Sequence, residues 1–319
     1  MAPEPFVPTR GLSNPHLQTI YSAVFARAPR PRLRRERWET PDGDFVDVDF
    51  VDGAAGTPWV HLFHGLEGSS NSPYARMLMR YVERAGWRGS VFHFRGCSGE
   101  PNRLPRAYHS GDVDEVGWAL QRVHERAGDA PLYAAGVSLG GNALAKWLGS
   151  AADATAIVAA AAIVSAPLDL MAAGDALGRG FGRVYARHFL GSLRKTALEK
   201  LERFPDLYDR GAVLSARTLR DFDNVVTAPL HGFRDTDDYW TRASSKPDLA
   251  HIRVPTLILN ARDDPFLPEQ ALPTERQVSA AVKLEFPLHG GHVGFVTGPF
   301  PGHIEWLPQR LLHFFRHLQ

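Results

Sequence analysis

The sequence has a single cysteine, Cys97, among its 319 residues. An intrachain disulfide is therefore excluded, and no Cys-x-x-Cys or His-Glu-x-x-His spacing indicates a zinc site. A secreted scaffold stabilised by disulfides is ruled out in the same way. This composition is typical of a protein from a reducing compartment, and we expect a cytoplasmic location.

An excess of charge of one sign is also lacking. Lys and Arg number 36, Asp and Glu number 35, and the formal net charge is +1. A general nucleic-acid binder is usually markedly basic, so we expect no nucleic-acid partner. The arginines between residues 27 and 37 are compatible with contact to anionic lipid head groups at a membrane surface. A solvated leader explains them more simply.

Long apolar runs are missing too. The longest, residues 156–164, is far shorter than the roughly 20 residues that span a bilayer. Residues 1–12 lack the apolar stretch of a secretory signal. The overall composition, 44% hydrophobic and 22% charged, is ordinary for a globular protein. The length fits one large domain or two small ones.

The apolar runs that are present predict an α/β fold with a mainly parallel sheet. Helical patterns alternate with these runs, and such alternation is typical of parallel strands joined by crossover helices. Residues 36–40 and 45–51 flank a Pro-Asp-Gly turn and predict an antiparallel hairpin at one edge. The predicted buried strands are 59–63, 90–94, 132–137, 156–164, 256–259 and 284–288, and the helices are 72–85, 111–126, 139–148 and 303–318.

One stretch, residues 169–250, breaks this alternation. It has helical periodicity and is interrupted by glycines and prolines. A structureless connection of this length is rare in a compact domain. We interpret the stretch as an inserted helical cap, the alternative being a lengthened crossover.

Residues 136–140 read Gly-Val-Ser-Leu-Gly and match the Gly-x-Ser-x-Gly nucleophile elbow. The pattern alone is weak, because it arises by chance in many sequences. Here an apolar strand leads into it and an amphipathic helix follows, which is the context that the elbow requires. Ser138 is therefore the candidate nucleophile.

A serine nucleophile needs a base and an acid that orients the base, and in α/β hydrolases they follow in the order Ser, acid, His. Asp263 and Asp264 both follow the strand 256–259 directly. We prefer Asp264, because a proline four residues later resembles the usual acid loop. Among fourteen histidines, His289 and His292 follow the last predicted strand. We prefer His292 as the base, because His292 followed by Val-Gly-Phe resembles the catalytic histidine of this superfamily more than His289 does.

Ester attack also needs main-chain N–H groups aimed at the developing oxyanion. The residue after the nucleophile, Leu139, is expected to supply one. Residues 64–68, His-Gly-Leu-Glu-Gly, follow an early strand, and Leu66 is the candidate for the second. His64 and Cys97 are interpreted as structural residues.

Several motifs together resemble the YheT-like α/β hydrolases, which are related to the ABHD lipases and to fungal medium-chain ethyl ester synthase/esterases. They are residues 14–19 (Asn-Pro-His-Leu-Gln-Thr), 64–68, 72–76 (Ser-Pro-Tyr-Ala-Arg), 94–99 (Phe-Arg-Gly-Cys-Ser-Gly) and 108–112 (Tyr-His-Ser-Gly-Asp). The resemblance runs across nearly the whole chain. It implies a serine esterase or lipase acting on acyl esters.

The expected function is therefore a serine carboxylic ester hydrolase that forms an acyl-enzyme with short- to medium-chain esters, using no cofactor and no metal. Its expected partner is a small-molecule or lipid ester. Acyl transfer to an alcohol by the same residues is the alternative, and a non-catalytic ligand-binding protein is a third reading. Ser138 precedes the insertion while Asp264 and His292 follow it, so the chain is expected to form one domain, residues 1–319.

Overall fold

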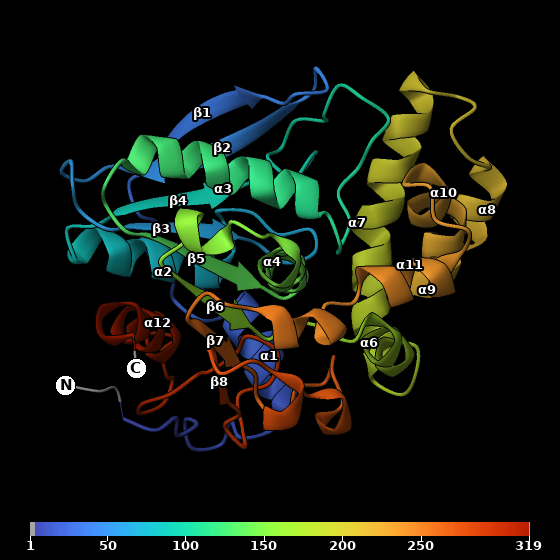
Figure 1. Ribbon diagram of the computed structural model, residues 1–319. Helices are drawn as coiled ribbons and strands as arrows, with labels where there is room; N and C mark the ends of the chain where they lie inside the picture. Colours follow the sequence, from blue (N-terminus) through green and yellow to red (C-terminus); the bar gives the residue numbers. More distant parts are fainter. Residues whose placement is uncertain (1–3, 319) are drawn as a thin grey trace.

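The computed structural model describes residues 4–318 and has one eight-stranded sheet at its centre (Figure 1). The strand order is β1-β2-β4-β3-β5-β6-β7-β8. β1 and β2 pair antiparallel, β2 pairs antiparallel with β4, and all other pairs are parallel. The strands are β1 (Arg34–Glu39), β2 (Phe45–Val51), β3 (Trp59–Phe63), β4 (Arg88–Phe92), β5 (Leu132–Val137), β6 (Ala160–Val164), β7 (Thr256–Leu259) and β8 (Val282–Glu285). The predicted α/β fold with an antiparallel edge is confirmed.

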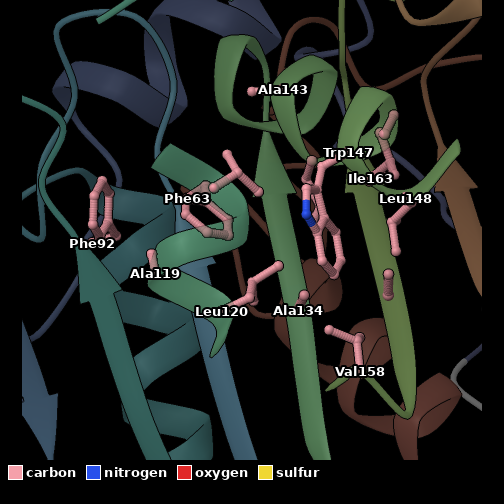
Figure 2. Packing of buried hydrophobic residues seen from close by; sticks show 14 of the residues in the cluster. Phe63, Phe92, Ala119, Leu120, Ala134, Ala143, Trp147, Leu148, Val158 and Ile163 are labelled. Carbon is pink, nitrogen blue, oxygen red and sulfur yellow. The ribbon is translucent and has the colours of Figure 1, made fainter. Parts of the chain in front are cut away.

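Helices cover both faces of the sheet, which is why its central strands are apolar throughout. On one face pack α3 (Val113–Ala127) and α4 (Leu139–Ser150), and on the other pack α2 (Pro73–Arg84) and α12 (Trp306–His317). Figure 2 shows the first face, where Leu120 of α3 and Trp147 of α4 lie against Phe63 and Ala134 of the strands. Successive strand residues alternate between the two clusters, as the pleat requires.

The connection between β6 and β7 is long and helical. Its helices gather at one end of the sheet, beyond the carboxyl ends of the parallel strands (Figure 1). The longest, α7, has 22 residues. The segments are α6 (Leu170–Leu177), α7 (Gly182–Arg203), α8 (Arg210–Ser215), α9 (Leu219–Phe222), the π-helical turn η1 (Asp223–Thr227), α10 (Ala228–Leu230), α11 (Thr236–Ala243) and the 3₁₀ turn η2 (Lys246–His251). We call residues 170–251 the β6–β7 segment.

Several predicted strands have wrong boundaries. β4 is Arg88–Phe92 and not 90–94, and β1 is Arg34–Glu39 and not 36–40. The run 156–164 begins as a helix, α5 (Ala154–Ile157), and only Ala160–Val164 forms a strand. The paired register with β5 starts at Ala160, preceded by a hydrogen bond from the Ala159 N–H to the Leu132 carbonyl. The last strand is β8 and not 284–288, because it pairs with β7 over Val282–Glu285. Two short turns precede β8, namely η3 (Glu269–Ala271) and η4 (Glu275–Gln277).

A helix before the sheet, α1 (Pro15–Val24), is not foreseen by the strand and helix patterns. Its start is specified locally, since the Asn14 side chain accepts hydrogen bonds from the N–H groups of His16 and Leu17 and a proline occupies the first helical position. The buried side of α1 is polar, a feature that the usual hydrophobic pattern misses.

The arginine-rich segment 27–37 is not a solvated leader along its whole length, because its last residues belong to β1. Arg35 and Arg37 of β1 form ion pairs with Asp49 and Asp47 of β2, at 2.7 Å and 2.9 Å. These arginines neutralise acids within the hairpin and are not available to a lipid surface. Within residues 4–318, no helix is both long enough and apolar enough to cross a membrane.

Candidate active site

Ser138 lies in the tight turn between β5, which ends at Val137, and α4, which begins at Leu139. Its φ of 52° is in the left-handed region, which is strained for a residue other than glycine. The turn requires glycine at position 140, because a Cβ there would lie 2.4 Å from the carbonyl oxygen of His64. The Ser138 N–H donates to the carbonyl of Val164, which fixes the turn on the neighbouring strand.

A chain of hydrogen bonds joins Ser138 to His292 and Asp264. The Ser138 Oγ lies 3.0 Å from His292 Nε2, and His292 Nδ1 lies 3.0 Å from Asp264 Oδ2. With the Nδ1 proton directed at the carboxylate, Nε2 is free to accept the serine proton. Asp264 is fully buried at its side chain and also accepts the N–H of Phe266. The Phe266 ring stacks on the imidazole at 3.9 Å between centroids, which further fixes the ring of His292.

The two alternatives, Asp263 and His289, form a second pair beside the first. Asp263 Oδ2 lies 3.2 Å from His289 Nδ1, and Asp263 Oδ1 accepts the N–H of Gly291. Neither residue has a hydrogen bond to Ser138 within residues 4–318. The structure therefore brings Asp264 and His292 to the serine, and Asp263 and His289 tie the adjacent loops together.

The two candidate oxyanion residues lie on the loop after β3 and at the start of α4. A Cβ on Gly65 would lie 3.1 Å from the Cβ of Ser138, so the loop passes directly beside the serine. Leu66 and Leu139 both line the cavity in front of Ser138. In the part of the chain that the structure describes, neither of their main-chain N–H groups has an acceptor. Both are therefore available to an oxygen placed next to Ser138.

Two tyrosines hold this loop, and the sequence reasoning did not single them out. The Tyr74 hydroxyl accepts the N–H of Gly65 at 2.9 Å. The Tyr108 hydroxyl accepts the N–H of Glu67 at 2.9 Å and donates to the Glu67 carboxylate at 2.7 Å. Burial raises the pKa of both phenols, which keeps them neutral. Both lie in motifs that already marked the resemblance, 72–76 and 108–112, and that was the available signal.

His64 and Cys97 lie near this loop without the means to act as base or nucleophile. His64 Nδ1 donates to the carbonyl of Gly65, and its Nε2 accepts the N–H of Phe94. Burial lowers the pKa of His64 to about 3, so the ring is neutral. Burial also raises the pKa of the Cys97 thiol, with a smaller contribution from the charge of Glu67, so the reactive thiolate is disfavoured.

A cavity that is partly open to solvent extends from Ser138 into the β6–β7 segment. Its wall is mainly apolar and comes from several elements of that segment. The apolar lining includes Leu170, Leu177, Leu193, Leu219, Phe222 and Val226.

A few polar groups also line the cavity. The Asp223 carboxylate accepts hydrogen bonds from Thr227 Oγ1 and Trp240 Nε1, and burial raises the pKa of Asp223 to about 6. Lys200 is saturated by acceptors of the loop 102–106. Within residues 4–318, no three His, Cys, Asp or Glu side chains are grouped so as to hold a metal ion.

The sequence also matches a family model. Residues 58–299 match the model described as alpha/beta hydrolase fold. The chain belongs to this family. The matched range contains the serine, the acid, the histidine and both oxyanion candidates, whereas α1 and the β1–β2 hairpin lie outside it.

Within the family this α/β hydrolase is YheT-like. It is 42% identical over 311 residues to the Escherichia coli (strain K12) protein named "Putative esterase YheT", covering 96% of this chain and 91% of that one. It is 30% identical over 321 residues to "Phospholipase ABHD3" of Mus musculus, covering 98% and 78% of the two chains. These relatives indicate a hydrolase of the esterase and lipase type.

Solved structures agree on the fold. Est1E from Butyrivibrio proteoclasticus, with ferulic acid bound, superposes with a TM-score of 0.59 at 14% identity, covering 89% of this chain and 98% of that one. The Pyrococcus furiosus esterase Pf2001 gives a TM-score of 0.56 at 13% identity, with 91% and 98% covered. At such low identity the likeness concerns the fold alone.

Proposed function

We propose that this α/β hydrolase is a serine carboxylic ester hydrolase that works through an acyl-enzyme. The observation that carries the proposal is the linear arrangement of Ser138, His292 and Asp264 on a strained elbow that opens into an apolar cavity. Serine is a weak nucleophile at neutral pH unless a base is within hydrogen-bond reach, and 3.0 Å meets that requirement.

Acylation would proceed in two steps. The Ser138 Oγ attacks the ester carbonyl carbon and its proton passes to His292 Nε2, while Asp264 stabilises the imidazolium. The carbonyl oxygen becomes negatively charged and accepts hydrogen bonds from the N–H groups of Leu66 and Leu139. The intermediate then collapses, the bond from carbon to the alcohol oxygen breaks, and His292 returns its proton to the departing alcohol.

Deacylation would repeat these steps with water. His292 takes a proton from the water as its oxygen attacks the acyl carbon, and the carboxylic acid leaves as Ser138 regains its proton. The neutral tyrosines Tyr74 and Tyr108 hold the oxyanion loop through both half-reactions.

We further propose that the β6–β7 segment acts as a cap that binds the acyl chain. The apolar cavity wall comes largely from α6, α7, α9 and η1, and an extended acyl chain would gain about 0.8 kcal/mol per buried CH₂ there. Short- to medium-chain esters are therefore the proposed substrates. A panel of aryl esters of increasing chain length should show a maximum at medium chains, and activity confined to acetate would contradict the acyl-pocket assignment.

The central test is Ser138→Ala. It should abolish ester hydrolysis and labelling by a fluorophosphonate probe, because the probe reacts only with an activated serine, while thermal unfolding stays close to that of the wild type. Ser150→Ala is a matched control, since Ser150 is an exposed serine on the same helix, α4, and this variant should keep full activity and labelling.

Two outcomes would argue against the proposal. Hydrolysis retained in Ser138→Ala would exclude Ser138 as the nucleophile. A wild-type serine that neither labels nor turns over esters would instead favour a ligand-binding protein with a preserved but inactive site.

Acyl transfer to an alcohol is a second candidate, favoured by the apolar cavity, in which an alcohol competes well with water for the acyl-enzyme. The same residues would serve, with the alcohol oxygen in place of water. Product analysis in the presence of added alcohol separates the two reactions. An ester product in excess over free acid would assign transfer, and free acid alone would assign hydrolysis.

We also propose contact with an anionic lipid surface. Leu17 of α1 and Phe181 and Val184 at the start of α7 are each about half exposed, and His16 packs on Phe181 at 4.3 Å between ring centroids, so these residues lie close together. Residues 5–33 and 176–198 contain no Asp or Glu and nine Lys and Arg together, so both segments carry a net positive charge. Co-sedimentation should be stronger with anionic vesicles than with zwitterionic ones. Equal binding to both kinds of vesicle, or binding to neither, would refute the contact.

A further inference from the structure

Helix α1 has a polar buried side, although buried helix faces are usually apolar. Its buried residues are Gln18, Thr19 and Ser22, with Gln18 fully inaccessible, whereas Leu17 and Val24 are exposed. Burying an amide side chain costs free energy unless its hydrogen bonds are made. The partners of these groups therefore indicate what the helix does.

The partners of Gln18 lie largely in the loop that carries His292. Gln18 Nε2 donates to the carbonyl of Val296 at 3.1 Å and to that of Leu12 at 2.7 Å, and Gln18 Oε1 accepts the N–H of Val296 at 2.7 Å. One side chain thus binds both main-chain groups of Val296, whose carbonyl also accepts the N–H of Thr9 at 3.0 Å.

Thr19 binds the histidine itself. Its Oγ1 accepts the main-chain N–H of His292 at 2.9 Å and donates to the carbonyl of Pro15 at 2.8 Å. The loop can approach this closely only because of its glycines. A Cβ on Gly291 would lie 2.5 Å from the Pro15 carbonyl oxygen and 2.7 Å from Thr19 Oγ1.

The loop needs such support because its backbone is strained. Val293 and Phe295 have φ angles of 58° and 42°, in the left-handed region that β-branched and aromatic residues rarely adopt. Such conformations persist only where surrounding contacts fix them. Besides α1, two further side chains bind this backbone. Asp263 Oδ1 accepts the N–H of Gly291 at 2.9 Å, and Ser165 Oγ accepts the N–H of Val293 at 3.2 Å.

We propose that Gln18 and Thr19 are positioning residues for His292. They hold the strained turn 291–296 so that the imidazole Nε2 stays within reach of the Ser138 hydroxyl. Helix α1 lies outside residues 58–299, the range that matches the general α/β-hydrolase model, so this support is an addition to the common fold. The proposal rests on the proposed function, because it concerns the same base.

The main test is Thr19→Val, which keeps the shape and removes both hydrogen bonds. We expect kcat to fall roughly tenfold to a hundredfold with little change in KM, because a misplacement of about 1 Å costs on this order. The rate of fluorophosphonate labelling should fall by a similar factor. Thr19→Ser restores the hydroxyl and should return kcat to within about twofold of the wild type. Gln18→Met should lower kcat in the same way.

Ser22→Ala is the matched control. Ser22 is buried on the same helix, but its hydroxyl donates to the carbonyl of Thr19 within the helix and has no bond to the turn 291–296. This variant should lose stability and keep its kcat per labelled active site.

The outcomes separate this inference from the proposed function. If Thr19→Val keeps wild-type kcat and labelling rate while only its Tm falls, α1 is merely structural and the positioning role is overturned. If Thr19→Ser fails to restore kcat, the hydroxyl is not the relevant group and the inference also fails. A wild type without labelling or turnover would instead refute the proposed function. Should Gln18→Met not fold, the decision rests on the two Thr19 variants.

Discussion

The sheet and the β6–β7 segment are held together in different ways. Two large apolar clusters, one on each face, unite the sheet with α2, α3, α4 and α12. The β6–β7 segment instead has several small clusters, such as that of Leu190, Val213 and Phe222 in α7 to α9. Because its apolar contacts are divided, the segment depends more on polar contacts with the sheet region.

Some of those polar contacts are well buried. The Asn142 amide of α4 donates to the carbonyls of Ser110 and Ala243, and its oxygen accepts the hydroxyl of Ser245. Lys200 of α7 donates to four acceptors in the loop 102–106. The difference suggests a division of labour in which tight main-chain contacts in the sheet fix the reacting groups and the segment shapes the cavity.

The largest contrast should appear at two glycines. Gly140→Ala would place a Cβ 2.4 Å and 2.6 Å from two main-chain oxygens, which cannot move without disrupting the elbow. We expect the free energy of unfolding to fall by about 5 kcal/mol and activity to be lost. Gly191→Ala, in α7, has nothing within 4 Å of the new Cβ and should stabilise the protein by up to about 1 kcal/mol. Urea denaturation measures both, and similar losses at the two sites would contradict the comparison.

An intermediate effect is expected where the two regions join. Lys200→Met leaves the Pro105 carbonyl and the Asn102 Oδ1 without this donor. The carbonyls of Leu104 and Arg106 keep only the Asn102 amide, so the free energy of unfolding should fall by about 3 kcal/mol. Limited proteolysis should then cleave the β6–β7 segment sooner. Lys195→Met on the same helix is the control, because Lys195 is largely exposed and should have almost no effect. Equal protease resistance in both variants would show that Lys200 does not anchor the segment.

The smallest effect concerns a titratable group within the segment. Burial raises the pKa of Asp223 from 3.8 to about 6, so the folded protein binds a proton that the unfolded chain has released between these values. The stability contributed by this carboxyl is therefore present at pH 4 and is lost as the pH rises through 6.

Asp223→Asn removes this titration. The variant should match the wild type at pH 4 and be more stable at pH 7 by roughly 2 kcal/mol, as thermal unfolding at the two pH values will show. The same change at the exposed Asp206 should alter stability little at either pH. A stability difference that does not depend on pH would disprove the assignment.

Much of the sheet could be predicted from the sequence, because parallel strands buried on both faces appear as continuous apolar runs. The elbow at 132–148 could also be predicted, because a strand, a serine and a helix in this order require small residues at fixed positions around the serine. The start of β6 could not be predicted in this way, because the alanines at 159–162 favour a helix by their intrinsic propensity and give no signal for a strand. Pairing with β5 decides where that strand begins.

The site shows a second limit. Asp263 and Asp264 are adjacent in sequence, and each pairs with a histidine of the same later loop. The Asp264–His292 pair differs from the Asp263–His289 pair in the direction of its side chains, which point to Ser138. That direction depends on the backbone of the loop. Helix α1 was missed for another physical reason. Its buried residues are polar, whereas Leu17 and Val24 are exposed, which departs from the usual pattern.

The contacts of α1 also have a consequence for the order of events during synthesis. Gln18 and Val296 are 278 positions apart, and Thr19 and His292 are 273 apart. A ribosome that has released α1 must still make nearly the whole chain before the buried polar groups of α1 can meet their partners. Closure of such a long loop is slow compared with local folding. We therefore expect the elbow and sheet to form early in a growing chain, and the histidine to reach the serine only when the newest residues meet the oldest.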